Sequence, residues 1–172
     1  MRVISKTPRF TIRNFKPEEE AIFLALFDDE AVTVHLPKRT REEHLKLFRE
    51  SLAEYDDGKA TGRWGMFSNG DGDYIGMCLL RPFDGDNTKI ELGYVLRQQY
   101  WGKGIATEMA NILIAYGFLH TNAAEIVAVT TPGNITSQKV LEKAGLTRAG
   151  NYTRAGAELP LFKIDRPVVA KN

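Results

Sequence analysis

Apolar and polar positions recur in short blocks along the chain, and each block predicts one element. In "RFTIRNF" (9–15) apolar and polar residues alternate, which is typical of a strand. Pro17 opens "PEEEAIFLALFDDEAV", where proline followed by three glutamates favours a helix start. A second helix is predicted from Thr40, because Glu43 follows three residues later as in a capping box. Its apolar stripe consists of Leu45, Phe48 and Leu52.

The rest of the chain predicts a hairpin and then alternating strands and helices. The turn-rich segments "DDGKATG" and "SNGDGD" bracket "RWGMF", and "YIGMCLLRPF" follows, which indicates a β-hairpin over about 63–82. Further elements are a strand at 89–96, a helix reaching Leu119, a buried strand at 125–131, a helix between Asn134 and Gly145, and strands at about 146–153 and 159–166. The predicted order is β-α-α-β-β-β-α-β-α-β-β, a mixed α/β fold in a single domain of residues 1–172.

Composition narrows the class of protein. The 172 residues are 43% hydrophobic, and 23 Lys and Arg balance 22 Asp and Glu, which argues against a nucleic-acid partner or an anionic membrane surface. The single cysteine, Cys78, lies in an apolar run and is expected to be an inert core thiol. No secretory signal is visible, and the longest apolar run, 112–119, is far shorter than the roughly 18 residues of a membrane span. We therefore expect a soluble, cytoplasmic protein, either a monomer or a homodimer.

Two glycines, Gly102 and Gly104, stand at a strand-to-helix junction in "ELGYVLRQQYWGKGIATEMA". Such a junction points backbone N–H groups and a positive helix end at one spot, which suits a phosphate. A Walker A loop is excluded, because no Gly-Lys-Ser/Thr occurs in the chain. A dinucleotide fingerprint fits only in part, because Thr107 replaces its third glycine and the next strand ends without an acidic residue. A tight turn that binds nothing remains a further alternative.

The segment from Gln99 to Gly104 matches every specified position of the pyrophosphate loop Gln/Arg-x-x-Gly-x-Gly/Ala of acetyl-CoA enzymes. Here the sequence resembles the GNAT acetyltransferase superfamily and, within it, the RimJ/RimL-like N-terminal acetyltransferases. "NITSQKVLEKAGL" resembles the second motif of that branch, and the element order matches the whole chain. The resemblance implies that the backbone from Gly102 to Thr107 cradles the pyrophosphate of acetyl-CoA, and that Val95 and Leu96 pair with the pantetheine arm. The residues expected to bind the coenzyme are Val95, Leu96, Arg97, Gln99, Gly102, Lys103, Gly104, Ile105, Ala106, Thr107, Asn134 and Ser137.

Acetyl transfer to an amine needs a base for the ammonium and an acid for the departing thiolate. Glu91 is the first candidate for the base, because a carboxylate within a central strand is costly unless it is paired or used. An ion pair with an arginine is the alternative explanation, and Glu158 is the second candidate base. Many relatives carry a tyrosine at the position of Leu141, so Ser137, one turn earlier, is the hydroxyl available as the acid. Asn134 is expected to cap the helix and to reach the pantetheine.

The histidines show no metal-like spacing, so we expect no metal site. His35 lies in a connection that overhangs the acceptor site in this fold. The expected function is transfer of acetyl from acetyl-CoA to a primary amine, with a protein or peptide N-terminus as the favoured acceptor. A polyamine, amino acid or aminoglycoside is the alternative acceptor, and an acyl-CoA-binding regulator without turnover is the alternative class.

Overall fold

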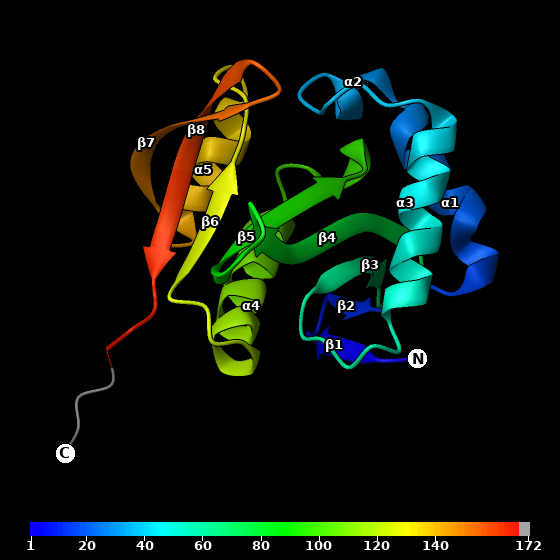
Figure 1. The fold of residues 1–172 in the computed structure, drawn as a ribbon. Helices are drawn as coiled ribbons and strands as arrows, with labels where there is room; N and C mark the ends of the chain where they lie inside the picture. Colours follow the sequence, from blue (N-terminus) through cyan, green and yellow to red (C-terminus); the bar gives the residue numbers. More distant parts are fainter. Residues whose placement is uncertain (169–172) are drawn as a thin grey trace.

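A mixed sheet of eight strands, in the order β1-β2-β3-β4-β5-β6-β8-β7, forms the centre of the computed structural model, which describes residues 1–168 (Figure 1). The strands are β1 (Val3–Lys6), β2 (Phe10–Arg13), β3 (Gly62–Ser68), β4 (Tyr74–Phe83), β5 (Asp86–Leu96), β6 (Glu125–Val129), β7 (Thr147–Arg154) and β8 (Ala157–Asp165). The helices are α1 (Glu20–Ala25), α2 (Glu30–Thr33), α3 (Arg41–Glu54), α4 (Ile105–His120) and α5 (Ile135–Lys143), with 3-10 turns η1 (Pro17–Glu19), η2 (Leu26–Asp28) and η3 (Gln98–Tyr100). The predicted fold class is confirmed.

The two faces of the sheet carry separate hydrophobic cores. On one face α4 packs through Met109 and Leu113 against the sheet, and Leu141 of α5 joins the same cluster. On the other face Phe23 of α1 and Phe48 of α3 surround Phe15, whose ring lies 5.5 Å from each. Figure 1 shows α1 and α3 together on one side of the sheet and α4 and α5 on the other. The helices are therefore sorted by face, and a site between the faces can open only where the sheet itself opens.

Capping chemistry fixes two helix starts where the sequence predicts them. Thr40 accepts a hydrogen bond from the Glu43 backbone N–H, and the Glu43 carboxylate accepts one from the Thr40 backbone N–H. Asn134 accepts a hydrogen bond from the backbone N–H of Ser137 at the start of α5. The Thr40 and Asn134 side chains thus accept hydrogen bonds from backbone N–H groups that have no partner within the first helical turn.

Three expectations differ from the structure. β1 was not predicted, because its four residues are too short and mixed to show a period. The predicted helix from Pro17 is broken into η1, α1, η2 and α2, since Asp29 adopts an extended backbone and its side chain accepts a hydrogen bond from the Ala31 N–H. β5 begins at Asp86 rather than Lys89, because Asp84 and Gly85 both have positive φ and make the turn tighter than expected.

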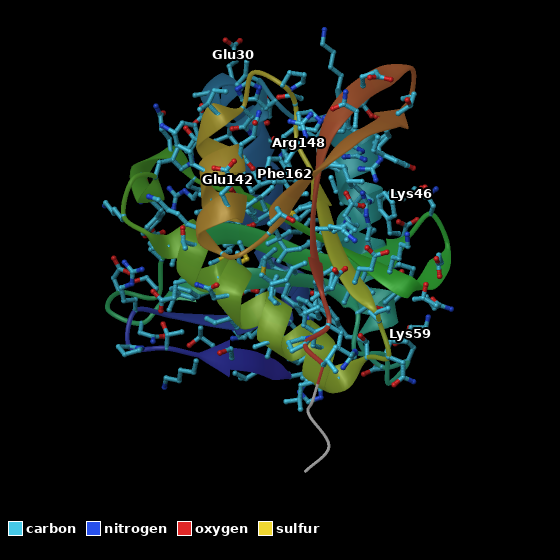
Figure 2. All side chains as sticks on the ribbon, turned by 90° about the vertical axis from the view of Figure 1, so that its left-hand side faces the viewer. Glu30, Lys46, Lys59, Glu142, Arg148 and Phe162 are labelled. Carbon is cyan, nitrogen blue, oxygen red and sulfur yellow. The ribbon has the colours of Figure 1, made fainter. Side chains whose placement is uncertain are left out.

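Charged side chains are displayed outward around these cores. Figure 2 shows Glu30, Lys46 and Lys59 at the periphery, whereas the Arg148 guanidinium lies over the Phe162 ring, 5.8 Å from its centroid. Cys78 is fully buried, and burial raises the pKa of its thiol, which confirms the expected core role. Among the helices of residues 1–168, none combines the length and the hydrophobicity that a bilayer crossing requires.

Candidate active site

The sheet opens between β5 and β6. These two strands are parallel and pair only from Lys89 to Glu91, so the last five residues of β5, Leu92–Leu96, have no partner on the β6 side. Figure 1 shows the two strands diverging beneath α2. A cavity of about 440 Å³ lies beside this free edge, lined by the end of β5, the loop into α4 and its first turn, one side of α5, and side chains between residues 31 and 36 from the other face. The cavity therefore receives side chains from both faces of the sheet.

The glycine loop forms one end of the cavity. Gly102 and Gly104 have φ of 69° and 74°, a left-handed conformation that side chains disfavour. A Cβ at Gly102 would meet nothing within 4 Å, so the space above this backbone is free for a ligand. Gly104 is the N-cap of α4 and offers no capping side chain, which leaves the N–H groups of the first turn to a ligand. The arrangement suits an anion.

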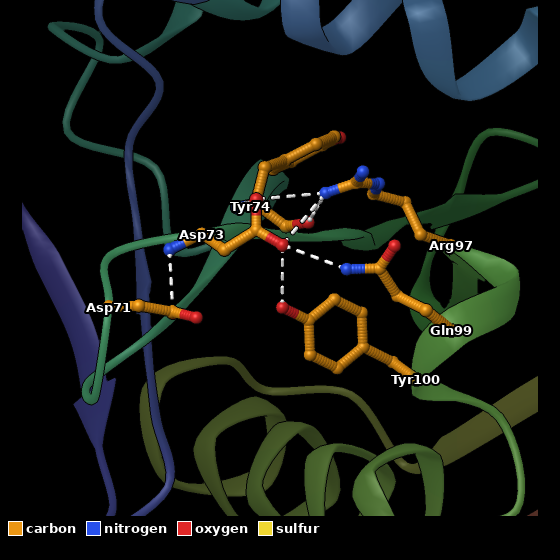
Figure 3. Close-up of polar contacts among 6 residues, drawn as sticks. All are labelled: Asp71, Asp73, Tyr74, Arg97, Gln99 and Tyr100. Atoms are coloured by element: carbon orange, nitrogen blue, oxygen red, sulfur yellow. Dashed lines mark hydrogen bonds and ion pairs between the residues drawn. The ribbon is translucent and has the colours of Figure 1, made fainter.

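An Asp73-centred network holds the segment before the glycines. Asp73 accepts hydrogen bonds from Arg97 (2.9 Å), Gln99 (2.9 Å) and Tyr100 (2.7 Å), as Figure 3 shows. The side chains of Arg97 and Gln99 are thus directed to the β3–β4 turn and do not line the cavity. The Lys103 side chain does not line it either, and its ammonium lies 5.7 Å from the Tyr100 ring centroid. These three predicted residues therefore do not line the cavity, and their role in binding the coenzyme stays a prediction.

A pair of hydroxyls lies at the β5 side of the cavity. Tyr94 donates a hydrogen bond to Ser137 Oγ over 3.3 Å, and both side chains line the cavity. Burial raises the pKa of Tyr94, with the hydrogen bond to Ser137 opposing in part, so the phenol keeps its proton at neutral pH. Leu141, by contrast, is 1% exposed and belongs to the core. Sequence reasoning missed Tyr94, although its alternation with Val95 places it on the face opposite Glu91.

Glu91 is buried and held by two arginines. Arg81 donates from Nε to Oε2 (2.8 Å), and Arg154 donates to Oε1 (2.9 Å) and Oε2 (3.0 Å). Burial by itself raises the pKa of Glu91, but the hydrogen bonds and charges of Arg154 and Arg81 outweigh it, so the pKa lies below its ordinary value. The ion pair that the sequence left as an alternative is present. Glu91 does not line the cavity, and its role as the base stays a prediction.

Glu158 and His35, the two other residues considered for the acceptor side, lie in different parts of the molecule. Glu158 is exposed in the β7–β8 hairpin and accepts hydrogen bonds from Asn151 (3.1 Å) and Thr153 (3.5 Å). His35 lines the cavity, and its Nδ1 lies 2.8 Å from Thr131 Oγ1, which ties the segment after α2 to the end of β6. Of the three polar residues considered for the acceptor side, only His35 therefore reaches the cavity.

Comparison with known proteins agrees with this geometry. Residues 9–147 match the Acetyltransferase (GNAT) domain. The chain belongs to the GNAT acetyltransferase family. It is 30% identical over 161 residues to the uncharacterized N-acetyltransferase p20 of Bacillus licheniformis, covering 89% of each chain.

Solved structures show the same GNAT fold. A GNAT-family acetyltransferase from Bacillus anthracis superposes with a TM-score of 0.79 at 22% identity over 95% of this chain and 98% of that one. The RimL ribosomal L7/L12 alpha-N-protein acetyltransferase in complex with coenzyme A superposes with a TM-score of 0.79 at 15% identity. The match covers 95% of this chain and 98% of that one. The predicted family and enzyme class, a GNAT N-acetyltransferase, are confirmed.

Within this GNAT fold, most of the predicted coenzyme residues line the cavity. They are Val95, Leu96, Gly102, Gly104, Ile105, Ala106, Thr107, Asn134 and Ser137. The cavity also receives Lys139 and Lys143, which sequence reasoning missed although their i, i+4 spacing places them on one face of α5. Residues 1–168 contain no group of three or more His, Cys, Asp or Glu side chains suited to a metal ion.

Proposed function

We propose that this chain transfers the acetyl group of acetyl-CoA to a primary amine, and that its favoured acceptor is the N-terminal amine of a protein or peptide. The observation that carries the proposal is the cavity that joins the glycine loop at the start of α4 to a hydroxyl pair beside an unpaired strand edge. The coenzyme A bound to RimL and the acceptor in that protein's name support the same assignment.

The residues present fit acetyl-CoA. The N–H groups from Gly102 to Thr107 would hold the pyrophosphate, and Lys139 and Lys143 would add positive charge to the same cavity. The free edge of β5 at Val95 and Leu96 would pair with the amide groups of the pantetheine arm, as an added strand does. Asn134, which already caps α5, contributes its amide to the cavity wall.

The hydroxyl pair would supply the acid. When the amine attacks the thioester carbonyl, the C–N bond forms, the C–S bond breaks, and the thiolate needs a proton. We propose that Ser137 delivers it and that the protonated Tyr94, hydrogen-bonded to Ser137, replenishes or orients that proton. An unperturbed thiol has a pKa of about 8.5, so solvent can also quench the thiolate, and the acid assists the reaction without being essential.

The need to deprotonate the acceptor favours an N-terminal amine. No carboxylate lines the cavity in the part of the chain that the structure describes. An α-amino group with a pKa of about 7.7–8.0 is already neutral in about a tenth of molecules at pH 7, whereas a lysine with a pKa of about 10.4 is almost wholly charged. A site without a strong base therefore suits the α-amine. Glu91, acting through water, is the first proposed base, and Glu158 is the second.

A thiol-release assay with acetyl-CoA tests the proposal. The panel holds N-terminal peptides, the same peptides blocked at the α-amine but carrying a free lysine, and polyamine, amino-acid and aminoglycoside acceptors. We expect the free N-terminal peptides to give the highest kcat/KM, with mass spectrometry placing the acetyl group on the α-amine. Preference for a small amine would favour the alternative acceptor class. Acetyl-CoA binding by calorimetry without thiol release from any amine would favour the regulator.

A further inference from the structure

Two arginines bind one carboxylate on the α1–α3 face of the sheet, and a third arginine lies near them on the same face. Arg63 of β3 donates hydrogen bonds to Leu47 O (3.2 Å) and Ser51 Oγ (2.9 Å) of α3, which identifies the face. Arg81 of β4 shares this face, because Leu79 lies opposite Arg63 and Arg81 follows two residues later. Glu91 lies directly opposite Arg81, and Arg154 reaches it from β7. We call Arg63, Arg81, Arg154 and Glu91 the arginine cluster.

The arginine cluster carries more positive than negative charge. Both oxygens of Glu91 are used, one by Arg154 alone and the other by Arg154 and Arg81. Arg81 has no hydrogen-bond partner for its two terminal nitrogens among residues 1–168, and its side chain is 44% exposed. Arg63 is partly buried, and its side-chain hydrogen bonds go only to neutral oxygens. Within the arginine cluster three guanidinium charges therefore face one carboxylate, while Glu54 and Asp84 act on Arg63 and Arg154 through space.

The groups around Arg63 add to the excess of positive charge. Burial lowers the pKa of Arg63, and the positive charges of Arg81 and of Arg39 lower it further, while Glu54 acts weakly in the opposite direction. A guanidinium stays protonated in a protein, so the consequence is a half-buried cation among like charges rather than a neutral group. An anion bound between Arg63 and Arg81 would relieve this repulsion and supply the missing hydrogen-bond acceptors.

The cluster adjoins the place where an acceptor would approach. Glu91 marks the last β5–β6 pair, and Val95, on the same face, lines the cavity four residues further along β5. At about 3.3 Å per residue, Glu91 and Val95 lie roughly 13 Å apart along β5, with Gly93 halfway between them. A peptide whose α-amine is near Val95 and which follows the face toward Glu91 would bring its fourth and fifth residues beside Arg81.

We propose that Arg81 and Arg63 form an acidic-side-chain subsite, so that the preferred acceptor is a peptide N-terminus with Asp or Glu at its fourth or fifth position. The inference rests on the proposed function and adds a substrate class to it. Glu91 and Arg154 then act as the scaffold that holds the Arg81 guanidinium in place.

Matched peptides test the subsite. One peptide carries Asp and Glu at positions four and five, and its partner carries Asn and Gln there. For the unaltered enzyme we expect kcat/KM to be at least about tenfold higher for the acidic peptide and the advantage to shrink with added salt, because exposed charge pairs are screened. Arg81→Gln should bring the ratio of kcat/KM between the acidic and the neutral peptide close to one, and Arg81→Lys should restore part of that ratio. The two peptides are compared within each variant, because Arg81 also donates a hydrogen bond to Glu91. Arg148→Gln is the control, because that arginine lies against Phe162 of the other core.

Direct binding separates this inference from the proposed function. The affinity of each peptide for the enzyme is measured by fluorescence anisotropy, alone and with coenzyme A, for the unaltered enzyme, Arg81→Gln and Arg63→Gln, after circular dichroism has shown that each variant folds. Tighter binding of the acidic peptide that Arg81→Gln abolishes supports the subsite even if no peptide is acetylated. Equal affinity and equal kcat/KM for the two peptides would overturn the subsite and leave the acetyltransferase assignment standing.

Discussion

Asp73 offers the sharpest test of how the glycine loop is held. Its carboxylate accepts hydrogen bonds from Arg97, Gln99 and Tyr100, which lie shortly before Gly102 (Figure 3). Asp73 does not line the cavity proposed for the coenzyme. Asp73→Asn replaces one carboxylate oxygen by an NH₂ group. This group is itself a donor, so it cannot accept the hydrogen bonds that the oxygen accepted. The loop should then lose its fixed position without losing any group that contacts the coenzyme directly.

The magnitude follows from the exposure of the network. Asp73 and Arg97 are each 37% exposed, so their ion pair is screened by solvent and contributes only a fraction of a kcal/mol. Adding the hydrogen bonds from Gln99 and Tyr100, at about 0.5–1 kcal/mol each, gives a total loss of about 1–2 kcal/mol. For a domain of this size that corresponds to a fall in Tm of roughly 2–8 °C. A loop that must be reordered on binding should weaken acetyl-CoA affinity by about three- to thirtyfold.

Calorimetric titration with acetyl-CoA and thermal unfolding of the same samples provide the assay. Asp71→Asn is the matched control, because it removes the same charge from the same turn while Asn keeps the oxygen that accepts from the Asp73 N–H. We expect the control to bind acetyl-CoA as the unaltered protein does. If Asp73→Asn and Asp71→Asn have the same affinity, the network does not position the glycine loop and the reasoning fails.

Three further substitutions probe the coenzyme, the strand edge and the buried carboxylate. Gly102→Asp places a carboxylate where the pyrophosphate is proposed, so calorimetry should show at least about 2 kcal/mol of lost acetyl-CoA affinity in a folded protein. In Gly76→Ala the new Cβ would lie 2.1 Å from Val95 O, so urea unfolding should show a loss of about 2–4 kcal/mol, against about 1 kcal/mol for Gly72→Ala, whose Cβ would meet no atom within 4 Å. Glu91→Gln should lower the rate on the acid limb by roughly 10²-fold if Glu91 is the base, with acetyl-CoA binding nearly unchanged. Because the folded pKa of Glu91 is depressed, its stabilisation is complete above the unfolded pKa of about 4.3 and is lost below it, so the stability gap to Glu91→Gln should close as pH falls from 5 toward the folded pKa.

The sequence predicts the fold well where one physical signal dominates. Thr40 and Asn134 mark helix starts because each side chain satisfies a backbone N–H that nothing else can reach. The first helical segment fails for the converse reason: its apolar residues persist through Phe27, but Asp29 hydrogen-bonds locally and breaks the helix. Hydrophobic periodicity alone does not reveal that a side chain such as Asp29 will compete with the helix for backbone hydrogen bonds.

The candidate site is predicted less completely, because its contacts join distant segments. The motif at Gln99 and Gly102 predicts the backbone of the loop, yet whether the Gln99 side chain faces the coenzyme or Asp73 depends on the β3–β4 turn 26 residues earlier. Likewise, the two arginines on Glu91 come from β4 and β7, and only the assembled register brings them together. Backbone geometry is encoded locally in these motifs, whereas side-chain partners are decided by the sheet.

The hydroxyl pair shows the same dependence on the assembled sheet. A tyrosine on α5 is the acid expected from relatives, and Leu141 at that position is buried in the core, where a phenol would find no place without displacing its neighbours. The free edge of β5 brings another phenol, Tyr94, to Ser137 from the opposite wall of the cavity. The proposed acid thus depends on a strand that has lost its β6 partner, and the same loss exposes the edge proposed for pantetheine. One local separation of two strands accounts for the groove proposed for the coenzyme, the position of the proposed acid and the proposed approach of the acceptor from the arginine face.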